Sequence, residues 1–374
     1  MDYGGHQSRV GLLDKVNKGK VLPIGSDVML DQERCILCTR CVRFLDEVTG
    51  THELVIKERG DRAELCLAAG ASVDNDYAAN IVDICPVGAL TSREFRFQKR
   101  VWYLESTDAV CTGCATGCNV RVDSRQDEIY RLKPRFNADV NGYWMCDAGR
   151  RTHCDNRGED RIDRNLVRSG ETMVVCSRQD AVPIAARALM AAGPVAVVVS
   201  ADVSLEEGFL LARLAARLPG ASLHMLPAAG SEISDDGMLI SADRHPNRRG
   251  LLELGFVETA VTPVDAGAAL IVRADVAAAG QDWPGFLESL PLATFVADRW
   301  GQTAAYADHV LAIGSHFEGQ ASFMNKDGLV QGSGASVAPP GDAVAGWTLL
   351  AALLAEAGGD SYGDVTELLQ VSSP

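Results

Sequence analysis

The sequence predicts an α/β protein in which two small cysteine-rich modules precede a doubly wound α/β domain. Eight of its eleven cysteines lie in two groups between residues 35 and 146. Beyond about residue 166, short apolar runs alternate with stretches of helical periodicity. This β-α-β-α order is typical of a parallel sheet that is covered by helices on both faces.

Composition limits the classes of partner that the chain can have. The 374 residues are 47% hydrophobic and 23% charged, which is ordinary for a globular protein of two or three domains. The net charge of −15 argues against nucleic acid or anionic lipid as a direct partner. We expect no signal peptide and no membrane span, because the most apolar run, residues 191–203, is short and interrupted. An odd number of cysteines, most of them at ligand spacings, suits a reducing compartment better than a disulfide framework.

The first cysteine group combines a tight triplet with one distant member. Cys35, Cys38 and Cys41 are separated by two residues each, and Cys85 follows much later with Pro86 after it. This spacing surrounds a 4Fe–4S cubane, in which each of the four iron corners needs one thiolate. We therefore predict that these four cysteines bind a first 4Fe–4S cluster, which a long loop closes.

Three arginines, Arg34, Arg40 and Arg43, interleave with the first group. They form either a solvated basic face or a set of positive charges that raises the reduction potential of the cluster. The sequence leaves both interpretations open.

The second group follows the same plan. Its triplet is Cys111, Cys114 and Cys118, in which glycines allow tight turns, and its fourth member is Cys146. Between them, residues 119–123 and 128–132 alternate as in a hairpin, which would return the chain toward the triplet. A structural zinc site is the alternative, but zinc sites prefer paired Cys-x2–4-Cys knuckles over a three-plus-one arrangement. We predict a second 4Fe–4S cluster on these four cysteines.

The remaining candidate ligands have simpler interpretations. His6 stands alone without a cysteine triplet beside it, and we interpret it as a surface or hydrogen-bonding residue. Cys66 and Cys176 lie in apolar stretches and are predicted to be buried structural thiols, whereas Cys154 fits neither group. We predict no catalytic residues, because no nucleophile–base arrangement and no glycine-rich nucleotide motif is present.

The alternation in residues 91–104 predicts a half-buried strand that bridges the modules. Later strands are predicted at residues 194–200, 268–272 and 293–297, and helices at residues 178–191, 205–218 and 343–357. We divide the chain into an N-terminal connector over residues 1–34, a first 4Fe–4S module over 35–104, a second over 105–165, and an α/β domain over 166–374.

With both groups identified, the chain resembles the G-subunit family of bacterial NADH–quinone oxidoreductase, which is respiratory complex I. The resemblance is carried by the following motifs: Met1–Arg9, Arg34–Arg43, Asp83–Thr91, Phe95–Phe97 with Arg100 and Trp102, and Val140–Arg150. In that family the first cluster lies on the electron path from flavin to quinone, and the second is an additional cluster off that path. The family normally begins with a 2Fe–2S domain and a His/Cys3 cluster, which this chain lacks, so a truncated gene, a split gene or a partner is implied.

The α/β domain is more loosely similar to the molybdopterin-oxidoreductase fold. Residues 303–311 and 318–331 resemble its late motifs. Active members usually carry a lysine two positions after the last cluster cysteine, where this chain has Ala148. The resemblance therefore implies two 4Fe–4S clusters and a degenerate domain without molybdopterin.

Together these observations predict an iron–sulfur electron-transfer subunit of NADH:quinone oxidoreductase, a translocase, that is not catalytically complete alone. The implied partners are the flavin-bearing NADH-oxidising subunit and the quinone-side iron–sulfur subunits, on the cytoplasmic face of the bacterial inner membrane. The alternatives are the equivalent subunit of an NAD-linked hydrogenase or formate dehydrogenase, a molybdopterin-oxidoreductase fragment, and a non-redox zinc scaffold.

Overall fold

The computed structural model describes residues 18–227, 234–260, 262–263, 265–280, 282–365 and 367–368, except the side chain at position 157. His6 and the Met1–Arg9 motif lie outside the described residues. The chain divides into two compact units, Met1–Val101 and Trp102–Pro374. The first group of four cysteines lies in the first unit and the second group in the other.

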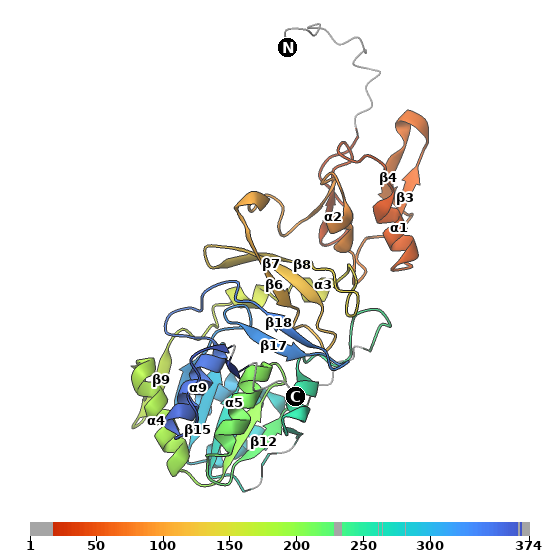
Figure 1. Ribbon diagram of the computed structural model, residues 1–374. Coiled ribbons are helices and arrows are strands. Elements are labelled where there is room, and N and C mark those ends of the chain that lie inside the picture. Colours follow the sequence, from red (N-terminus) through yellow and green to blue (C-terminus); the bar gives the residue numbers. More distant parts are fainter. Residues whose placement is uncertain are drawn as a thin grey trace. The chain divides into compact units, whose positions relative to one another are not determined.

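The first unit is small and is built around two short antiparallel sheets (Figure 1). One sheet pairs β1 (Leu22–Pro23), β2 (Val28–Leu30) and β5 (Leu90–Ser92), and the other is the hairpin of β3 (Leu54–Lys57) and β4 (Glu64–Leu67). The helical segments are α1 (Arg40–Glu47), the 3-10 turn η2 (Gly60–Arg62) and α2 (Asn80–Ile84). Leu30, Phe44, Leu45 and Ile81 are buried, so the two helices share a small apolar core with the sheets.

The predicted strand over residues 91–104 is wrong. Strand β5 ends at Ser92, turns follow, and the 3-10 turn η3 covers Val101–Tyr103. Phe97 adopts a φ of 66°, in the left-handed region that a strand does not use, and its side chain is 89% exposed. Alternation of aromatic and charged side chains therefore marks an exposed turn here and not a half-buried strand.

The second unit begins with an antiparallel sheet that holds the second cysteine group. Strands β6 (Glu105–Val110), β7 (Asn119–Arg125) and β8 (Glu128–Pro134) pair in sequence order. The predicted hairpin across residues 119–132 is thereby confirmed, and its turn residues Gln126 and Asp127 both have positive φ. The helix α3 (Asp147–Arg150) and the 3-10 turn η4 (Cys154–Arg157) follow.

The rest of the second unit is an α/β layer structure around an eight-stranded sheet of order β10-β9-β16-β15-β14-β11-β12-β13 (Figure 1). Its strands are β9 (Asn165–Ser169), β10 (Thr172–Cys176), β11 (Val195–Val199), β12 (Ser222–Met225), β13 (Val257–Glu258), β14 (Ala268–Val272), β15 (Ala293–Ala297) and β16 (His309–Ala312). The strands from β16 to β13 are parallel, whereas β9 and β10 form an antiparallel hairpin at one edge. The sheet is therefore mixed, and the expectation of a parallel sheet holds for the strands from β16 to the edge strand β13 but not for β9 and β10.

Helices cover both faces of this sheet. Alternate residues of a strand point to opposite faces, and on β11 Val197 packs in the core formed with α4, α5 and α9, while Val198 packs with α7 and α8. The helical segments are α4 (Arg178–Ala191), α5 (Leu205–Ala215), α6 (Arg248–Glu253), α7 (Val276–Ala279), α8 (Asp282–Ser289), η5 (Gln302–Tyr306) and α9 (Gly346–Glu356). The predicted strands and helices of this region are confirmed to within a few residues at their ends.

A last hairpin leaves the sheet and reaches back to the cysteine-bearing part of the second unit. It consists of β17 (Ala321–Met324) and β18 (Val330–Ser333), which pair antiparallel. Across the described part of the chain, no helix combines the length and the apolar character needed to cross a bilayer.

Candidate metal centres

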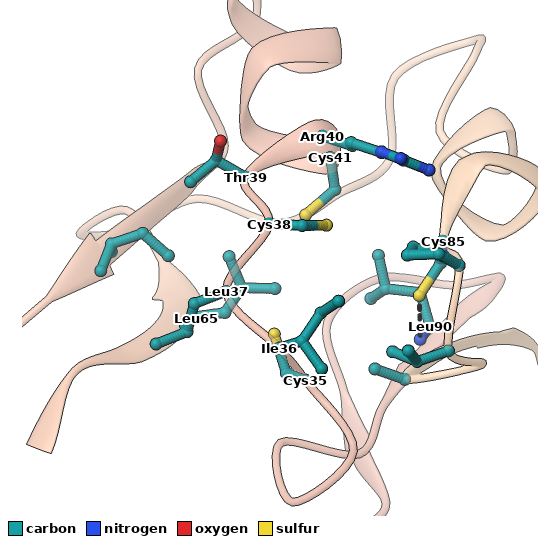
Figure 2. A pocket seen from close by; sticks show the side chains of 14 residues that line it. Cys35, Ile36, Leu37, Cys38, Thr39, Arg40, Cys41, Leu65, Cys85 and Leu90 are labelled. Carbon is teal, nitrogen blue, oxygen red and sulfur yellow. Dashed lines mark hydrogen bonds between the residues drawn. The ribbon is translucent and has the colours of Figure 1, made fainter. Parts of the chain in front are cut away.

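The structure brings the four cysteines of the first group to one small cavity. Cys35 and Cys38 lie on the loop that leads into α1, and Cys41 lies in the first turn of that helix. Cys85 directly follows α2. Figure 2 shows the sulfur atoms of Cys35, Cys38, Cys41 and Cys85 around a common space. The other lining side chains are mostly apolar, among them Ile36, Leu37, Ile56, Leu65, Pro86, Val87 and Leu90. Such a wall limits the access of water to a metal core.

The tight wrapping of this loop depends on two unusual backbone conformations. Leu37 has a φ of 53° and Thr39 a φ of 61°, both in the left-handed region. For a β-branched residue such as Thr39 this conformation is strained, and strain of this kind concentrates at functional sites. Thr39 is also the residue before the first turn of α1, so the backbone reverses between Cys38 and Cys41.

Polar groups lie close to the first group of cysteines. The backbone N–H of Leu90 donates a hydrogen bond to Sγ of Cys85 over 3.5 Å. Arg40 lines the cavity beside the cysteines (Figure 2). All three arginines are exposed, and Arg34 and Arg43 pair with Asp31 and Glu47. Arg40 is therefore the arginine of this group that reaches the wall of the cavity, and the structure otherwise supports a solvated basic face.

The second group is enclosed more deeply. Cys111, Cys114, Cys118 and Cys146 are only 3–6% exposed. Cys111 and Cys118 follow β6 and precede β7, and the N–H of Cys111 donates to the carbonyl of Cys118 over 2.8 Å. Cys146 precedes α3, and its Sγ accepts a hydrogen bond from the N–H of Gly149 over 3.3 Å. The hairpin of β7 and β8 therefore returns the chain toward the triplet, as the sequence predicts.

Burial and mutual proximity raise the pKa of several of these thiols. Burial raises the pKa of Cys111 to about 12 and also raises the pKa of Cys118 and Cys146, and the charges of neighbouring cysteines act in the same direction. In the first group, burial raises the pKa of Cys41 to about 11. Thiols with such pKa values stay protonated at neutral pH unless a metal replaces the protons. A four-thiolate set with this burial fits a 4Fe–4S core, and zinc is the other metal that the same donors suit.

Residues far along the chain hold the second cysteine loop, and sequence reasoning did not assign them this role. The side chain of Gln331 on β18 donates to the carbonyl of Gly117 over 2.9 Å, and the side chain of Asn325 donates to the carbonyl of Thr116 over 3.3 Å. Gly117 has a φ of 63°, and a Cβ there would lie 3.0 Å from the Gln331 side chain. The 318–331 motif was the only sequence signal for this contact.

The backbone of residues 239–243 also holds the second cysteine loop, through two hydrogen bonds. The hydroxyl of Thr116 donates to the carbonyl of Leu239 over 2.7 Å, and the N–H of Ala115 donates to the carbonyl of Asp243 over 2.8 Å. Nothing in the sequence around residue 240 signals this contact, because it uses backbone carbonyls that any residue could provide.

Replacing Gly149 by Ala should weaken metal binding by the second group of cysteines. A Cβ at this position would lie 3.0 Å from Sγ of Cys111 and 3.3 Å from Sγ of Cys146. The sulfurs must then shift, and we expect a cost of about 1–3 kcal/mol with faster loss of iron to a chelator. The matched control is Gly285→Ala in α8, where the added methyl group meets nothing within 4 Å. A Gly149→Ala protein that keeps its second cluster as long as the wild type would contradict this account.

The three remaining cysteines occupy different environments. Cys66 on β4 is only half-buried, so the prediction of a buried structural thiol is wrong for it; its neighbour Leu65 fills the core instead. Cys176 at the end of β10 is also only partly buried, so it is not a fully buried thiol either, but it packs against the core of α4, α5 and α9 as predicted. Cys154 is exposed.

Comparison with known proteins agrees with the division of eight cysteines into two groups of four. Residues 25–91 match the family model "NADH-quinone oxidoreductase subunit 3, ferredoxin-like domain", and residues 104–155 match "NADH-ubiquinone oxidoreductase NDSU1/NuoG-like, 4Fe-4S domain". The first match contains Cys35, Cys38, Cys41 and Cys85, and the second contains Cys111, Cys114, Cys118 and Cys146. Each match therefore includes one complete group of cysteines.

Curated relatives align over about half of this chain. The G subunit of the NADH-quinone oxidoreductase of Streptomyces coelicolor is 35% identical over 198 residues, which are 52% of this chain and 24% of the relative. The corresponding subunit 3 of Thermus thermophilus is 36% identical over 52% of this chain and 25% of its own length. The mitochondrial 78 kDa subunit of NADH-ubiquinone oxidoreductase from Candida albicans is 36% identical over 46% of this chain and 24% of its own length.

This chain thus spans about a quarter of the length of these relatives. A solved NAD+-reducing [NiFe]-hydrogenase is 38% identical over 21% of this chain and 35% of its own, with a TM-score of 0.18, which is too low to indicate a shared fold. The resemblance to the G subunit of NADH-quinone oxidoreductase is confirmed for the cysteine-bearing half of the chain.

Proposed function

We propose that this chain is an iron–sulfur electron-transfer subunit of an NADH–quinone oxidoreductase of the complex I type. It passes electrons that come from NADH and flavin toward quinone. The observation that carries the proposal is the presence of two separate four-cysteine sites, each inside a match to an iron–sulfur domain of this enzyme. On this proposal the chain does not complete the reaction alone, because two electron carriers do not replace the flavin and quinone sites that the reaction also needs.

The ligand assignments follow the two groups. Cys35, Cys38, Cys41 and Cys85 bind a first 4Fe–4S cluster, and Cys111, Cys114, Cys118 and Cys146 bind a second. The first cluster lies on the path to quinone, and the second is an additional carrier. Support comes from the common cavity of the first group and the shared burial of the second.

A bound cubane would supply one-electron chemistry, and the protein controls it through the surrounding groups. The sulfur ligands form a cage that limits rearrangement. The Leu90 N–H at the first site and the Gly149 N–H at the second donate to sulfur, which favours the more negative, reduced state. Burial of the second group disfavours added negative charge, so the second site depends more on such donors.

The remaining assignments concern the whole chain. The domain boundaries at residues 34, 104 and 165 separate a connector, two 4Fe–4S modules and an α/β domain of molybdopterin-oxidoreductase type. Ala148 at the position of the usual lysine supports a domain that carries no molybdopterin. The proposed partners are the flavin-bearing and quinone-side subunits of the peripheral arm, on the cytoplasmic face of the membrane.

Anaerobic reconstitution tests the proposal directly. We expect about eight iron and eight sulfide ions per chain, since two cubanes contain that number. Mössbauer spectra should show cubane iron only, and low-temperature EPR of the reduced protein should show two distinguishable signals. A colourless protein with stoichiometric zinc, or one that never binds more than one cubane, would overturn the proposal.

A further inference from the structure

A large open cavity lies at the carboxyl ends of the central parallel strands. Its volume is about 490 Å³, within the range of small-molecule sites. It is lined by residues from the loops that follow four strands: Asp202 after β11, Arg273–Asp275 after β14, Asp298–Gly301 after β15 and Ser315–Phe317 after β16. After β11, strands β12 and β13 are added on one side of β11, and β14 is then added on the opposite side of β11. Ligands of open α/β sheets bind at this kind of reversal in strand order.

The cavity also adjoins the second cysteine group. Thr112 and Gly113, which lie between Cys111 and Cys114, form part of its wall. Arg244 lines the same cavity, and its charge acts on both Cys111 and Cys146. Its backbone position is held firmly, because the preceding residue, Asp243, accepts the hydrogen bond from Ala115 in the cysteine loop.

The carboxylates in the wall already have partners within the protein. Asp202 accepts from Ser200 over 2.8 Å and pairs with His245 over 3.1 Å. Asp275 accepts from the N–H of Gln302 over 3.0 Å and from both donors of Thr303. The other two are the acids of ion pairs: Asp298 pairs with Arg273 over 3.1 Å, and Asp155 with Arg299 over 3.6 Å.

Two of the three arginines in the wall also have partners within the protein. Arg273 is buried against Glu207 at 2.8 Å and also donates to the carbonyl of Gly314. Arg299 donates to Asp160 over 2.6 Å. Positive charge on these two side chains is therefore balanced before any ligand enters.

Three polar side chains of the wall are not committed. Among the described residues, the side chains of Thr112, Arg244 and His316 have no hydrogen bond or ion pair. The contacts of His316 are edge-on to the rings of Phe317 and Phe323. Burial and the charge of Arg273 lower the pKa of His316, so its imidazole is neutral at pH 7 and can accept or donate one hydrogen bond.

We propose that this cavity binds a small organic oxyanion, a phosphate ester or a carboxylate, through Arg244, and that the bound charge lowers the reduction potential of the second cluster. A guanidinium binds either oxyanion through two parallel hydrogen bonds. His316 supplies a neutral contact, and the exposed ring of Trp300 gives the organic part an apolar surface. The coupling to the cluster rests on the proposed function, whereas binding itself does not.

The coupling has a simple electrostatic cause. Without ligand, the positive charge of Arg244 favours the extra electron of the reduced second cluster. An oxyanion that pairs with Arg244 cancels this charge close to Cys111 and Cys146, so reduction becomes less favourable. The first cluster, in the other unit, serves as an internal reference because its ligands include no group of this cavity.

Binding is measured first, by isothermal calorimetry on the purified full chain. The probes are inorganic phosphate, phenyl phosphate and benzoate, with chloride at equal ionic strength as the blank. We expect heat of binding from phenyl phosphate or benzoate, loss of at least tenfold in affinity in Arg244→Gln, and partial retention in Arg244→Lys. The matched control is Arg249→Gln, which removes an exposed arginine that pairs with Glu253, and it should bind as the wild type does. The preference between the two organic probes tells a phosphate ester from a carboxylate.

Coupling is measured next, by EPR-monitored redox titration of the reconstituted protein. At the potential where the second cluster is half reduced, a saturating probe should lower its reduced-to-oxidised ratio about tenfold, which corresponds to ~59 mV for one electron. Arg244→Gln should show a similar decrease without any probe and no further response to it. The first cluster should not respond in either case.

The outcomes separate the two proposals. No binding by any probe, or equal binding in Arg244→Gln, overturns the ligand site whether or not clusters are present. Binding that leaves the potential of a confirmed second cluster unchanged overturns the coupling. Absence of the second cluster itself is a failure of the proposed function, and the calorimetric result on the site then stands by itself.

Discussion

Replacing Cys85 by Ser is expected to abolish the first cluster and to leave the second intact. Cys85 is the one cysteine of the first group that lies far from Cys35, Cys38 and Cys41 in the sequence, and the two groups lie in separate compact units. Iron should fall from about eight to about four ions per chain, because one cubane is lost. The EPR signal of one cluster should disappear while the other keeps its shape and potential.

The reciprocal change, Cys146→Ser, should remove the second cluster only. Its sulfur shares the buried site with Cys111, and a hydroxyl is a poor replacement for a thiolate at iron. Cys66→Ser is the matched control, since Cys66 is a half-buried cysteine of the first unit outside the cavity, and it should keep both clusters. Loss of both signals in either ligand variant, or of neither, would show that the cysteines are grouped in another way.

Replacing Arg273 by Leu is expected to destabilise the α/β part of the protein by about 3–5 kcal/mol, the usual effect of removing one partner of a buried ion pair. The side chains of Arg273 and Glu207 are 6% and 4% exposed, and their closest approach is 2.8 Å. Glu207 also caps α5, because its carboxylate accepts from the N–H of Ser204. Without Arg273 the Glu207 charge stays buried and uncompensated. Urea denaturation followed by far-UV circular dichroism measures the loss.

An exposed pair of the same type provides the control. Arg213 pairs with Asp360, and both side chains are about half exposed. Arg213→Leu should cost no more than about 1 kcal/mol, as is usual for surface ion pairs. If both variants lose the same stability, the buried pair has no special role.

The buried pair of Arg273 and Glu207 also predicts that the stability of the fold decreases at acidic pH. Burial opposes ionisation of Glu207, but Arg273 outweighs it and lowers the pKa of Glu207 below its ordinary value of 4.5. A carboxylate with a lowered pKa stabilises the fold above the unfolded-state pKa and loses this contribution as the pH falls through the folded-state pKa. The wild type should therefore lose stability on acidification below about pH 4.5, and Arg273→Leu should show a smaller dependence in that range.

Local rules predicted those parts of the chain whose structure is decided by neighbours in sequence. Strands β14 and β15 and helix α4 have the predicted bounds. The pattern of apolar residues that identifies each of them lies within the segment itself, and the capping residue Ser177 directly precedes α4. The failed prediction over residues 91–104 has the opposite cause. A backbone reversal at Phe97 exposes a side chain that the pattern alone assigns to a strand.

The sequence by itself determined the two groups of four cysteines, since only a few spacings allow one loop to surround a cubane. It also determined the alternation of strands and helices. Only the tertiary structure decided that β9 and β10 join the sheet antiparallel and that Gln331 and Asn325 hold the second cysteine loop. It also decided that Arg244 and that loop line one open cavity. These features join residues more than 100 positions apart through side-chain and backbone contacts, and no local periodicity or spacing encodes such a contact.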